Sequence, residues 1–238
     1  MCIGVSWSFT PDEFAHIWRE ADLDRYPFPL RILETSRTEA EAAALRRTLH
    51  ARPDLDRDPD LSACLRILAD PHTRVVVIGA HHELDHEIRV VGAAVYDRAV
   101  LAVQDPGTSP GFGGSVHLSI GRSAKLGARI AGQLPDATAG RAPARSAPAE
   151  AVRDDETVVA THPAAPRIRR LLLEPHTSEG HIRIEPRRDR ETPPPPVHYT
   201  WIDVTGDGRY LIRADDEVHI APAAAAQVAA QIQKRIPR

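Results

Sequence analysis

Apolar residues recur at helical spacing in three segments of the N-terminal third of the chain. In residues 10–22 they fall at i, i+3, i+4 and i+7, the spacing of one helix face: Phe14, Ile17, Trp18 and Ala21. A threonine followed three residues later by glutamate makes a capping box at Thr10 and again at Thr38, which predicts helices over 10–22 and 38–51. A third helix is predicted over 58–70. It ends there because residue 71 is a proline, which disfavours a helical backbone at the residue before it.

Shorter apolar and β-branched runs then predict strands. Three strands joined by short polar turns favour an antiparallel meander: residues 74–80, 88–96 and 99–104. A fourth strand is predicted over 115–120, after a Gly/Pro-rich loop. A helix over 122–134 follows and is weakened by two internal glycines. The C-terminal third is predicted to hold a helix over 167–173, strands near 181–185, 197–204, 209–213 and 217–220, and a last helix over 223–236.

The order helix, four strands, helix therefore occurs twice, and two sequence matches indicate an internal duplication. Residues 68–73 (LADPHT) match residues 172–177 (LLEPHT) at an offset of 104. Residues 116–118 (VHL) match residues 218–220 (VHI) at an offset of 102. Two such units can pair their edge strands into one sheet about a quasi-twofold axis, so that neither half keeps a long free edge.

Between the two halves, residues 136–157 are rich in Ala, Pro, Arg and Ser and have no apolar period. Such composition predicts a linker or loop. We therefore expect a single domain over 1–238, with a first half at 1–135 and a second half at 158–238.

Composition narrows the classes of function. The 238 residues are 42% hydrophobic and 26% charged, and 30 basic against 33 acidic side chains give a formal net charge of −3. Without a block of like charges, neither nucleic acid nor a membrane is expected as a partner. Cys2 and Cys64 cannot build a disulfide framework or a four-cysteine zinc site. The first residues lack a basic n-region and no apolar run reaches about 18 residues, so a cytoplasmic protein without membrane insertion is expected.

One segment, residues 81–87, carries a cluster of potential metal ligands: His81, His82, Glu83, Asp85, His86 and Glu87, with Leu84 among them. Imidazoles and carboxylates are common zinc ligands. His82 and His86 have the spacing that converges on a helix, but predicted strands flank them, so a polar hairpin tip is the preferred interpretation. A metal-dependent enzyme using this hairpin and a generic peptide-binding module stay open as alternatives. No phosphate-binding loop or nucleophile elbow is present, so no catalytic residue, metal or cofactor is expected.

Four blocks, in order along nearly the whole chain, carry a resemblance to a known family. They are residues 9–14 (FTPDEF) with Trp18 and Glu20, residues 27–30 (PFPL) leading to Thr38 and Glu39, residues 97–102 (DRAVLA), and Trp201 with Asp203 and residues 207–210 (DGRY). In these blocks the chain resembles the EspG family, the cytosolic secretion-associated chaperones of actinobacterial type VII (ESX) secretion systems.

The resemblance implies an α/β (α+β) fold: a quasi-twofold, internally duplicated unit with a central antiparallel β-sheet and two α-helical bundles. It also implies a non-enzymatic chaperone that binds the tip of the PPE-like protein in a PE/PPE-like heterodimer. The chaperone would keep that pair soluble and direct it to the type VII secretion machinery. An exposed apolar tip is an aggregation liability until a partner covers it.

In the family, the sheet and the C-terminal bundle form the contact surface, and a hairpin loop of the sheet contributes to it. The resemblance places the corresponding partner-binding residues in three segments. They are His81, His82, Glu83, Leu84, Asp85 and His86 in the hairpin, Arg167, Arg170, Leu171 and Glu174 in the helix over 167–173, and Val228 and Ile232 in the last helix.

Overall fold

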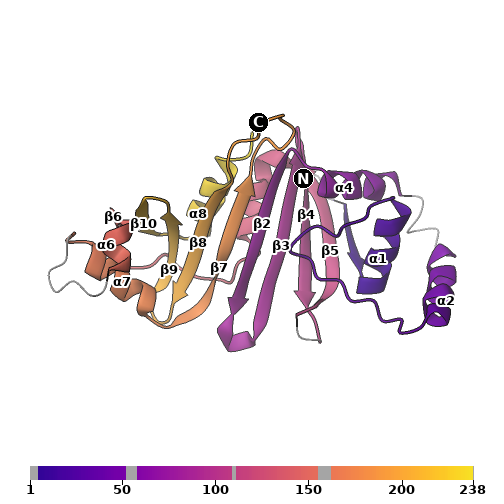
Figure 1. Cartoon of the computed structure of the whole chain (residues 1–238), viewed down its shortest axis with the longest axis horizontal. Helices are drawn as coiled ribbons and strands as arrows, with labels where there is room; N and C mark the ends of the chain where they lie inside the picture. Colours follow the sequence, from indigo (N-terminus) through magenta and orange to yellow (C-terminus); the bar gives the residue numbers. More distant parts are fainter. Residues whose placement is uncertain (1–4, 52–57, 109–110, 155–161, 238) are drawn as a thin grey trace.

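The structure, a computed structural model, describes residues 5–51, 58–108, 111–154 and 162–237. Within these ranges one ten-stranded antiparallel sheet runs along the molecule, with seven α-helices against it (Figure 1). The strands are β1 (Ser6–Phe9), β2 (Thr73–His81), β3 (His86–Val95), β4 (Arg98–Pro106), β5 (Gly113–Arg122), β6 (Arg145–Pro148), β7 (His176–Glu185), β8 (Val197–Val204), β9 (Gly208–Ala214) and β10 (Glu217–Pro222). The helices are α1 (Pro11–Glu20), α2 (Glu39–His50), α4 (Pro59–Ala69), α5 (Leu126–Ala131), α6 (Ala149–Arg153), α7 (Ala165–Leu173) and α8 (Ala225–Gln233), with 3₁₀ turns η1 (His82–Leu84) and η2 (Ser123–Lys125).

The order of the strands is symmetric about the centre of the sheet. It reads β1-β5-β4-β3-β2-β7-β8-β9-β10-β6, so that four strands flank β2 in the same way that four others flank β7. The two halves join through the antiparallel β2–β7 pair, where Val77 lies opposite Ile182. This arrangement confirms the predicted fold class, including the quasi-twofold duplication.

The duplication extends to single side chains. At one end of the sheet, Ser8 Oγ lies 2.8 Å from His117 Nδ1 across the β1–β5 pair. At the other end, Ser146 Oγ lies 2.6 Å from His219 Nδ1 across the β6–β10 pair. His117 and His219 are the histidines of the repeated segments found in the sequence, so the repeat reflects equivalent positions in the two halves.

Helices α5 and α8 lie side by side on one face of the sheet, over its centre. Their apolar side chains pack with those of β2, β7 and β8 into one core: Leu126 and Ile130 from α5, Val228 and Ile232 from α8, and Val77, Ile182 and Trp201 from the sheet. The two helices approach closely at Gly127, where an added Cβ atom would lie 2.5 Å from the carbonyl oxygen of Ala229. A side chain at residue 127 would therefore separate them.

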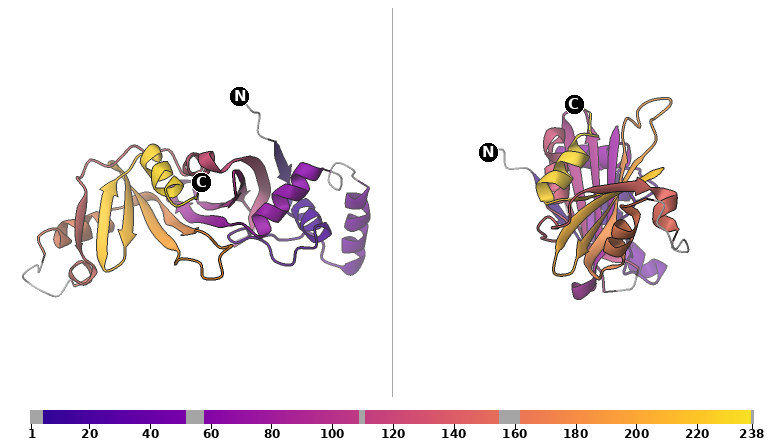
Figure 2. Two further views of the ribbon diagram at one scale, coloured as in Figure 1. Left: turned by 90° about the horizontal axis from the view of Figure 1, so that it is seen from above. Right: turned by 90° about the vertical axis from the view of Figure 1, so that its left-hand side faces the viewer.

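On the opposite face of the sheet, the helices of the described ranges pack over the two ends. Helices α1, α2 and α4 pack over β3, β4 and β5 around Phe14 and Trp18. Helices α6 and α7 pack over β8, β9 and β10 around Ile168 and Tyr210. In the part of the chain that the structure describes, these two helical layers leave the middle of this face without a helix over it, and α7 and α8 lie on opposite sides of the sheet (Figures 1 and 2).

The predicted helix starts are confirmed by their caps. Thr10 and Glu13 form the capping box of α1, and Thr38 and Glu41 form that of α2. Asp58 accepts hydrogen bonds from two backbone amides at the start of α4. These side chains satisfy amides that have no partner inside the helix.

The expectation of a linker or loop over 136–157 is wrong for residues 145–153. Strand β6 pairs with β10 at the edge of the sheet, and α6 follows it directly. A four-residue edge strand with one buried side chain, Ala147, has too few positions to show an alternating pattern. Residues 155–157 lie outside the described ranges, and the division into halves at 135 and 158 stays a prediction.

Candidate docking surface

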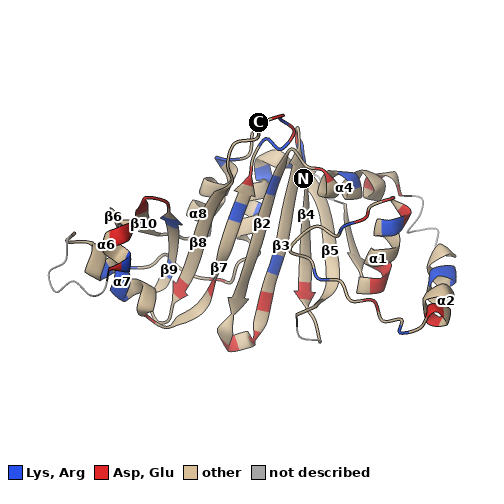
Figure 3. Cartoon of the chain, viewed as in Figure 1, with Lys and Arg blue, Asp and Glu red and all other residues tan. Residues whose placement is uncertain are grey.

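The uncovered middle of the sheet presents outward-facing side chains of four neighbouring strands, which we call the open strip. It consists of Ile78 and Ala80 on β2, Glu87 on β3, Glu179, His181 and Arg183 on β7, and His198 and Thr200 on β8. The alternation of strand side chains explains it, because the intervening residues of the same strands face the core under α5 and α8. Figure 3 shows basic and acidic residues interspersed on these strands, so the strip has no single sign of charge.

The predicted hairpin residues form a protruding tip at one end of the open strip. Residues 82–86 are exposed, and Leu84, an apolar side chain, is 58% exposed. Asp85 ends the η1 turn in the left-handed conformation, with φ at 50°. The tip contacts β7, since His82 Nε2 lies 3.7 Å from a carboxylate oxygen of Glu179. The other carboxylate oxygen of Glu179 lies 2.9 Å from Nδ1 of His176 on the same strand.

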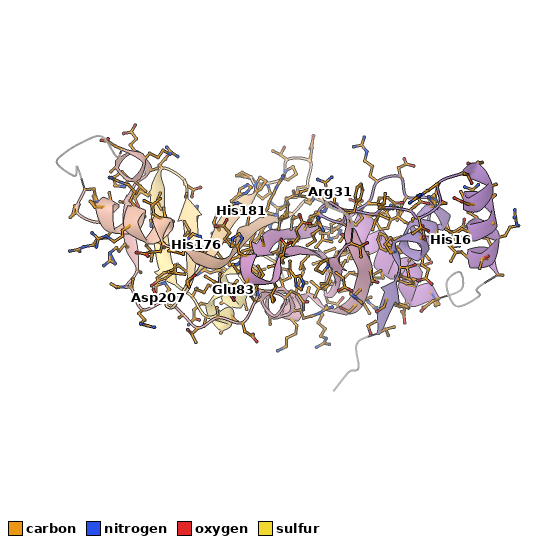
Figure 4. All side chains as sticks on the ribbon, turned by 90° about the horizontal axis from the view of Figure 1, so that it is seen from below. His16, Arg31, Glu83, His176, His181 and Asp207 are labelled. Atoms are coloured by element: carbon orange, nitrogen blue, oxygen red, sulfur yellow. The ribbon has the colours of Figure 1, made fainter. Side chains whose placement is uncertain are left out.

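The predicted α7 residues lie at the same edge of the sheet. Helix α7 ends at Leu173, which is 82% exposed, and β7 begins three residues later at His176. The four residues predicted from this segment line one cavity of about 270 Å³: Arg167, Arg170, Leu171 and Glu174. Figure 4 views this edge from below and labels Glu83 of the tip together with His176 and His181 of β7. The hairpin and α7 are therefore brought to one side of the molecule.

The two α8 residues do not belong to this surface. Val228 and Ile232 have 0% exposure and pack against Leu126 and Ile130 of α5. They also lie on the other face of the sheet from the open strip. The expectation that they contact a partner is wrong, because the apolar face of an amphipathic helix packs into its own core.

Sequence reasoning missed the sheet positions of the open strip. Ile78, His181 and Arg183 fall within predicted strands and Glu179 lies two residues before one, and alternation along a strand shows that its two faces differ without showing which face a helix covers. Leu173 was also missed. Its position as the last residue of the helix, two residues before Pro175, was the available signal for an exposed apolar residue.

The described residues of the hairpin do not converge on a point where a metal ion could bind. His82 begins the η1 turn and His86 begins β3, and among the described residues three ligand atoms of the tip do not come together there. Nor does the described part of the chain offer an activated thiol. Cys64 is buried in the N-terminal core, and burial raises the pKa of its thiol to about 12. A thiol with so high a pKa stays protonated and is a poor nucleophile at neutral pH.

At each end of the sheet a serine, a histidine and a carboxylate lie in contact, which are the residue types of a catalytic triad. Their placement across paired edge strands indicates a structural role. His117 bonds Ser8 through Nδ1, and its Nε2 lies 2.8 Å from Asp105 Oδ2. The equivalent His219 bonds Ser146, and its Nε2 lies 3.4 Å from Glu217. These side chains lie on the solvent-exposed surface of both sheet ends, whereas acyl transfer also needs oxyanion donors in a water-excluded site. The repetition at equivalent edge positions favours a structural role.

Comparisons with known proteins agree on one family. A model described as the EspG family matches residues 10–234. Among solved structures, the chain is similar to the Mycobacterium tuberculosis type VII secretion system chaperone EspG5, determined in complex with a PE25–PPE41 dimer. The TM-score is 0.66 at 15% sequence identity, over 97% of this chain and 95% of that one. No curated protein matches the sequence, and no helix in the described ranges is long and apolar enough to cross a membrane.

Proposed function

The chain belongs to the EspG family, and from this premise we propose that it is a type VII secretion chaperone that binds a PE/PPE-like heterodimer through the PPE-like subunit. The single observation that carries the proposal is the shared fold over nearly the full length of EspG5, a chaperone whose structure holds a PE/PPE dimer. On this proposal the protein acts in the cytoplasm, without catalysis, and delivers the pair to the secretion machinery.

We propose that the client binds at the open strip, the hairpin tip and the exposed side of α7. Three apolar side chains are exposed on this surface, namely Ile78, Leu84 and Leu173. A protruding apolar tip of a helical bundle would bury them, which favours association. The surrounding charged residues would select among related clients, because an unpaired buried charge costs more than a matched pair contributes.

The charge distribution makes this surface suited to an oriented client. Arg167 and Arg170 are exposed on α7, whereas Glu83, Asp85 and Glu179 are exposed at the hairpin end. A client with acidic residues facing α7 and basic residues facing the tip would bind in one orientation only, since the reverse places like charges together.

The experiment is co-expression with a PE/PPE-like pair encoded in the same genome, followed by size-exclusion chromatography with mass determination. We expect one ternary species with one copy of each chain. The variants Leu84→Asp and Arg170→Glu should weaken client binding by at least about tenfold, as changes at interface hot spots do. Arg47→Glu, an equally exposed charge reversal on α2, should leave binding unchanged.

The outcomes separate the proposal from its rivals. Failure to associate with any encoded PE/PPE-like pair would contradict the chaperone function. If the protein binds the pair and neither variant weakens binding, the chaperone function stands and the proposed docking surface is wrong. A metal-dependent enzyme would instead show turnover that is lost in a His82→Ala/His86→Ala variant, and a generic peptide-binding module would capture extended peptides in the absence of a PE-like chain.

A further inference from the structure

Helix α2 is attached to the rest of the molecule by few apolar contacts. Of its twelve residues, Leu49 is fully buried and Leu45 is partly buried against the N-terminal core. A helix of this length is marginal in water by itself, so α2 depends on tertiary contacts. One further contact is made by its last residue, His50, whose ring meets that of His16 on α1.

Three side chains with metal-binding atoms meet at this contact. His16 and Glu20 are four residues apart on α1, which places them on the same side of the helix. His50 reaches them from α2, with its Nε2 3.7 Å from a carboxylate oxygen of Glu20. The three ligand atoms all lie within 4.8 Å of one another. Figure 4 labels His16 at this end of the molecule, far along it from the hairpin residue Glu83.

We propose that His16, Glu20 and His50 form a zinc-binding site that ties α2 to α1. Two imidazoles and one carboxylate are a frequent zinc ligand set, and water completes the tetrahedron. Zinc bonds of about 2.1 Å require ligand atoms about 3.4 Å apart. The His50–Glu20 separation is already close to that value, and rotation of these two exposed side chains closes the remaining distance to His16.

One ligand is buried and two are exposed, which would let a zinc ion bind between the two helices and keep a water in its fourth position. His16 is 1% exposed, so its ring is held in place by the packing of α1 against α2. The side chains of His50 and Glu20 are about half exposed, at 50% and 48%. A zinc ion can therefore enter from solvent and find one ligand already oriented. The competing arrangement is a simple ion pair between His50 and Glu20, which contributes little at a surface.

The proposal is independent of client binding. The site belongs to the N-terminal helices, whereas the proposed docking surface lies on the open strip, the hairpin tip and α7. The hairpin is nevertheless the obvious competing zinc ligand set, with His81, His82 and His86 close in sequence. Any test has to separate these two locations on the same chain.

The test is a zinc titration of the full chain, without a histidine tag and after treatment with a chelator, in competition with a chromophoric chelator. We expect one equivalent of zinc to bind and to raise the unfolding midpoint. His50→Ala and Glu20→Gln should each weaken zinc binding by at least about tenfold. Both residues are exposed, so these variants should keep the circular dichroism spectrum of the parent. Amide hydrogen exchange over 39–50 should slow with zinc in the parent and stay unchanged in His50→Ala.

A His82→Ala/His86→Ala variant provides the matched control and should bind zinc like the parent. The proposal is overturned if the parent takes up no zinc, or if His50→Ala binds as tightly as the parent. It is equally overturned if binding is lost in the hairpin variant, because the zinc would then lie at the tip. None of these results depends on whether a PE/PPE-like pair associates.

Discussion

Arg209 and Asp203 form a buried ion pair in the second half of the molecule. The guanidinium donates from Nε and Nη2 to the two carboxylate oxygens, each at 2.7 Å, and also to the carbonyl of Pro135 at 2.6 Å. Both side chains are almost fully buried, at 1% and 5% exposure. Removing one partner would leave the other charge buried without compensation. We expect Arg209→Ala to lower the free energy of unfolding by about 3–5 kcal/mol in urea titrations.

Arg213 on the same strand supplies the control. It pairs with Asp215 at 2.6 Å, but its side chain is 44% exposed and that of Asp215 is 61% exposed. Exposed pairs contribute little, so Arg213→Ala should change the free energy of unfolding by less than about 1 kcal/mol. Equal losses from the two substitutions would show that burial does not determine the value of the Arg209 pair.

Asp207, in the turn between β8 and β9, makes stability depend on pH in a defined direction. The hydroxyl of Tyr210 donates a hydrogen bond to its carboxylate and lowers the pKa of Asp207 in the folded state. A lowered folded-state pKa stabilises the protein above the unfolded value of about 4, and this contribution is lost as pH falls through the folded pKa. Asp207 therefore makes the free energy of unfolding depend on pH only at acidic pH.

The variant Tyr210→Phe tests this dependence. The difference in free energy of unfolding between parent and variant should shrink as pH is lowered from 6 towards 3. Tyr210 also accepts a hydrogen bond from the amide of Ala142, and that loss does not titrate, so it adds a constant difference. A gap that stays the same at every pH would rule out the coupling between Asp207 and Tyr210.

At the scale of elements, the contact between α5 and α8 depends on a missing side chain. A Cβ atom at Gly127 would lie 2.5 Å from the carbonyl oxygen of Ala229 and 3.0 Å from Cβ of Gln233. We therefore expect Gly127→Ala to force the helices apart and to destabilise the protein by about 1–3 kcal/mol, measured by thermal or urea unfolding.

Gly132 at the end of α5 is the matched comparison. Its backbone has φ at −73°, and an added Cβ atom would come no closer than 3.5 Å to a neighbouring atom. Alanine fits there without strain and restricts the unfolded chain, so Gly132→Ala should be neutral or stabilising by up to about 1 kcal/mol. If Gly127→Ala behaved like Gly132→Ala, the close approach of the helices would not be required.

The sequence predicts those helices and strands whose pattern is contained in neighbouring residues. Capping boxes and apolar periods locate α1 and α2, because both are properties of neighbouring residues. Strands β1 and β6 lack such signals, since each has four residues and pairs only through one neighbour at the sheet edge. A local pattern also could not place the two α8 residues correctly. Val228 and Ile232 mark the apolar face of the helix, but the sequence does not show whether a partner or the protein's own core buries that face.

At the scale of the whole molecule, the repeat predicts the symmetric sheet, but the proposed docking surface depends on which part of the sheet the described helices leave uncovered. The open strip exists because α5 and α8 cover one face of the central strands while the other helices pack at the two ends of the opposite face. No local pattern in β2 or β7 contains that information. The family resemblance therefore implies the hairpin tip and α7 as contact segments, but it assigns no individual residue of the sheet between them.

The symmetric sheet also predicts that the halves depend on each other. Strands β2 and β7 pair from Arg74 opposite Glu185 to His81 opposite Ser178, and the core under α5 and α8 draws residues from both halves. A chain ending at residue 135 would expose one long strand edge, and a chain starting at 136 would expose the other. Such edges are templates for aggregation. We expect neither fragment to unfold cooperatively alone, and co-expressed fragments to form one complex with the circular dichroism spectrum of the parent.

Two adjacent positions on β7 test whether this reassembly uses the native pairing. Ile182 faces the core and is 1% exposed, whereas Arg183 faces the open strip. Ile182→Asp should abolish the complex between fragments, because it buries a charge without a partner. Arg183→Asp introduces the same side chain one residue later and should leave the complex intact. A second fragment that folds cooperatively by itself would show instead that the repeat joins two independent units, and that the central strand pair holds them together without being needed to fold either one.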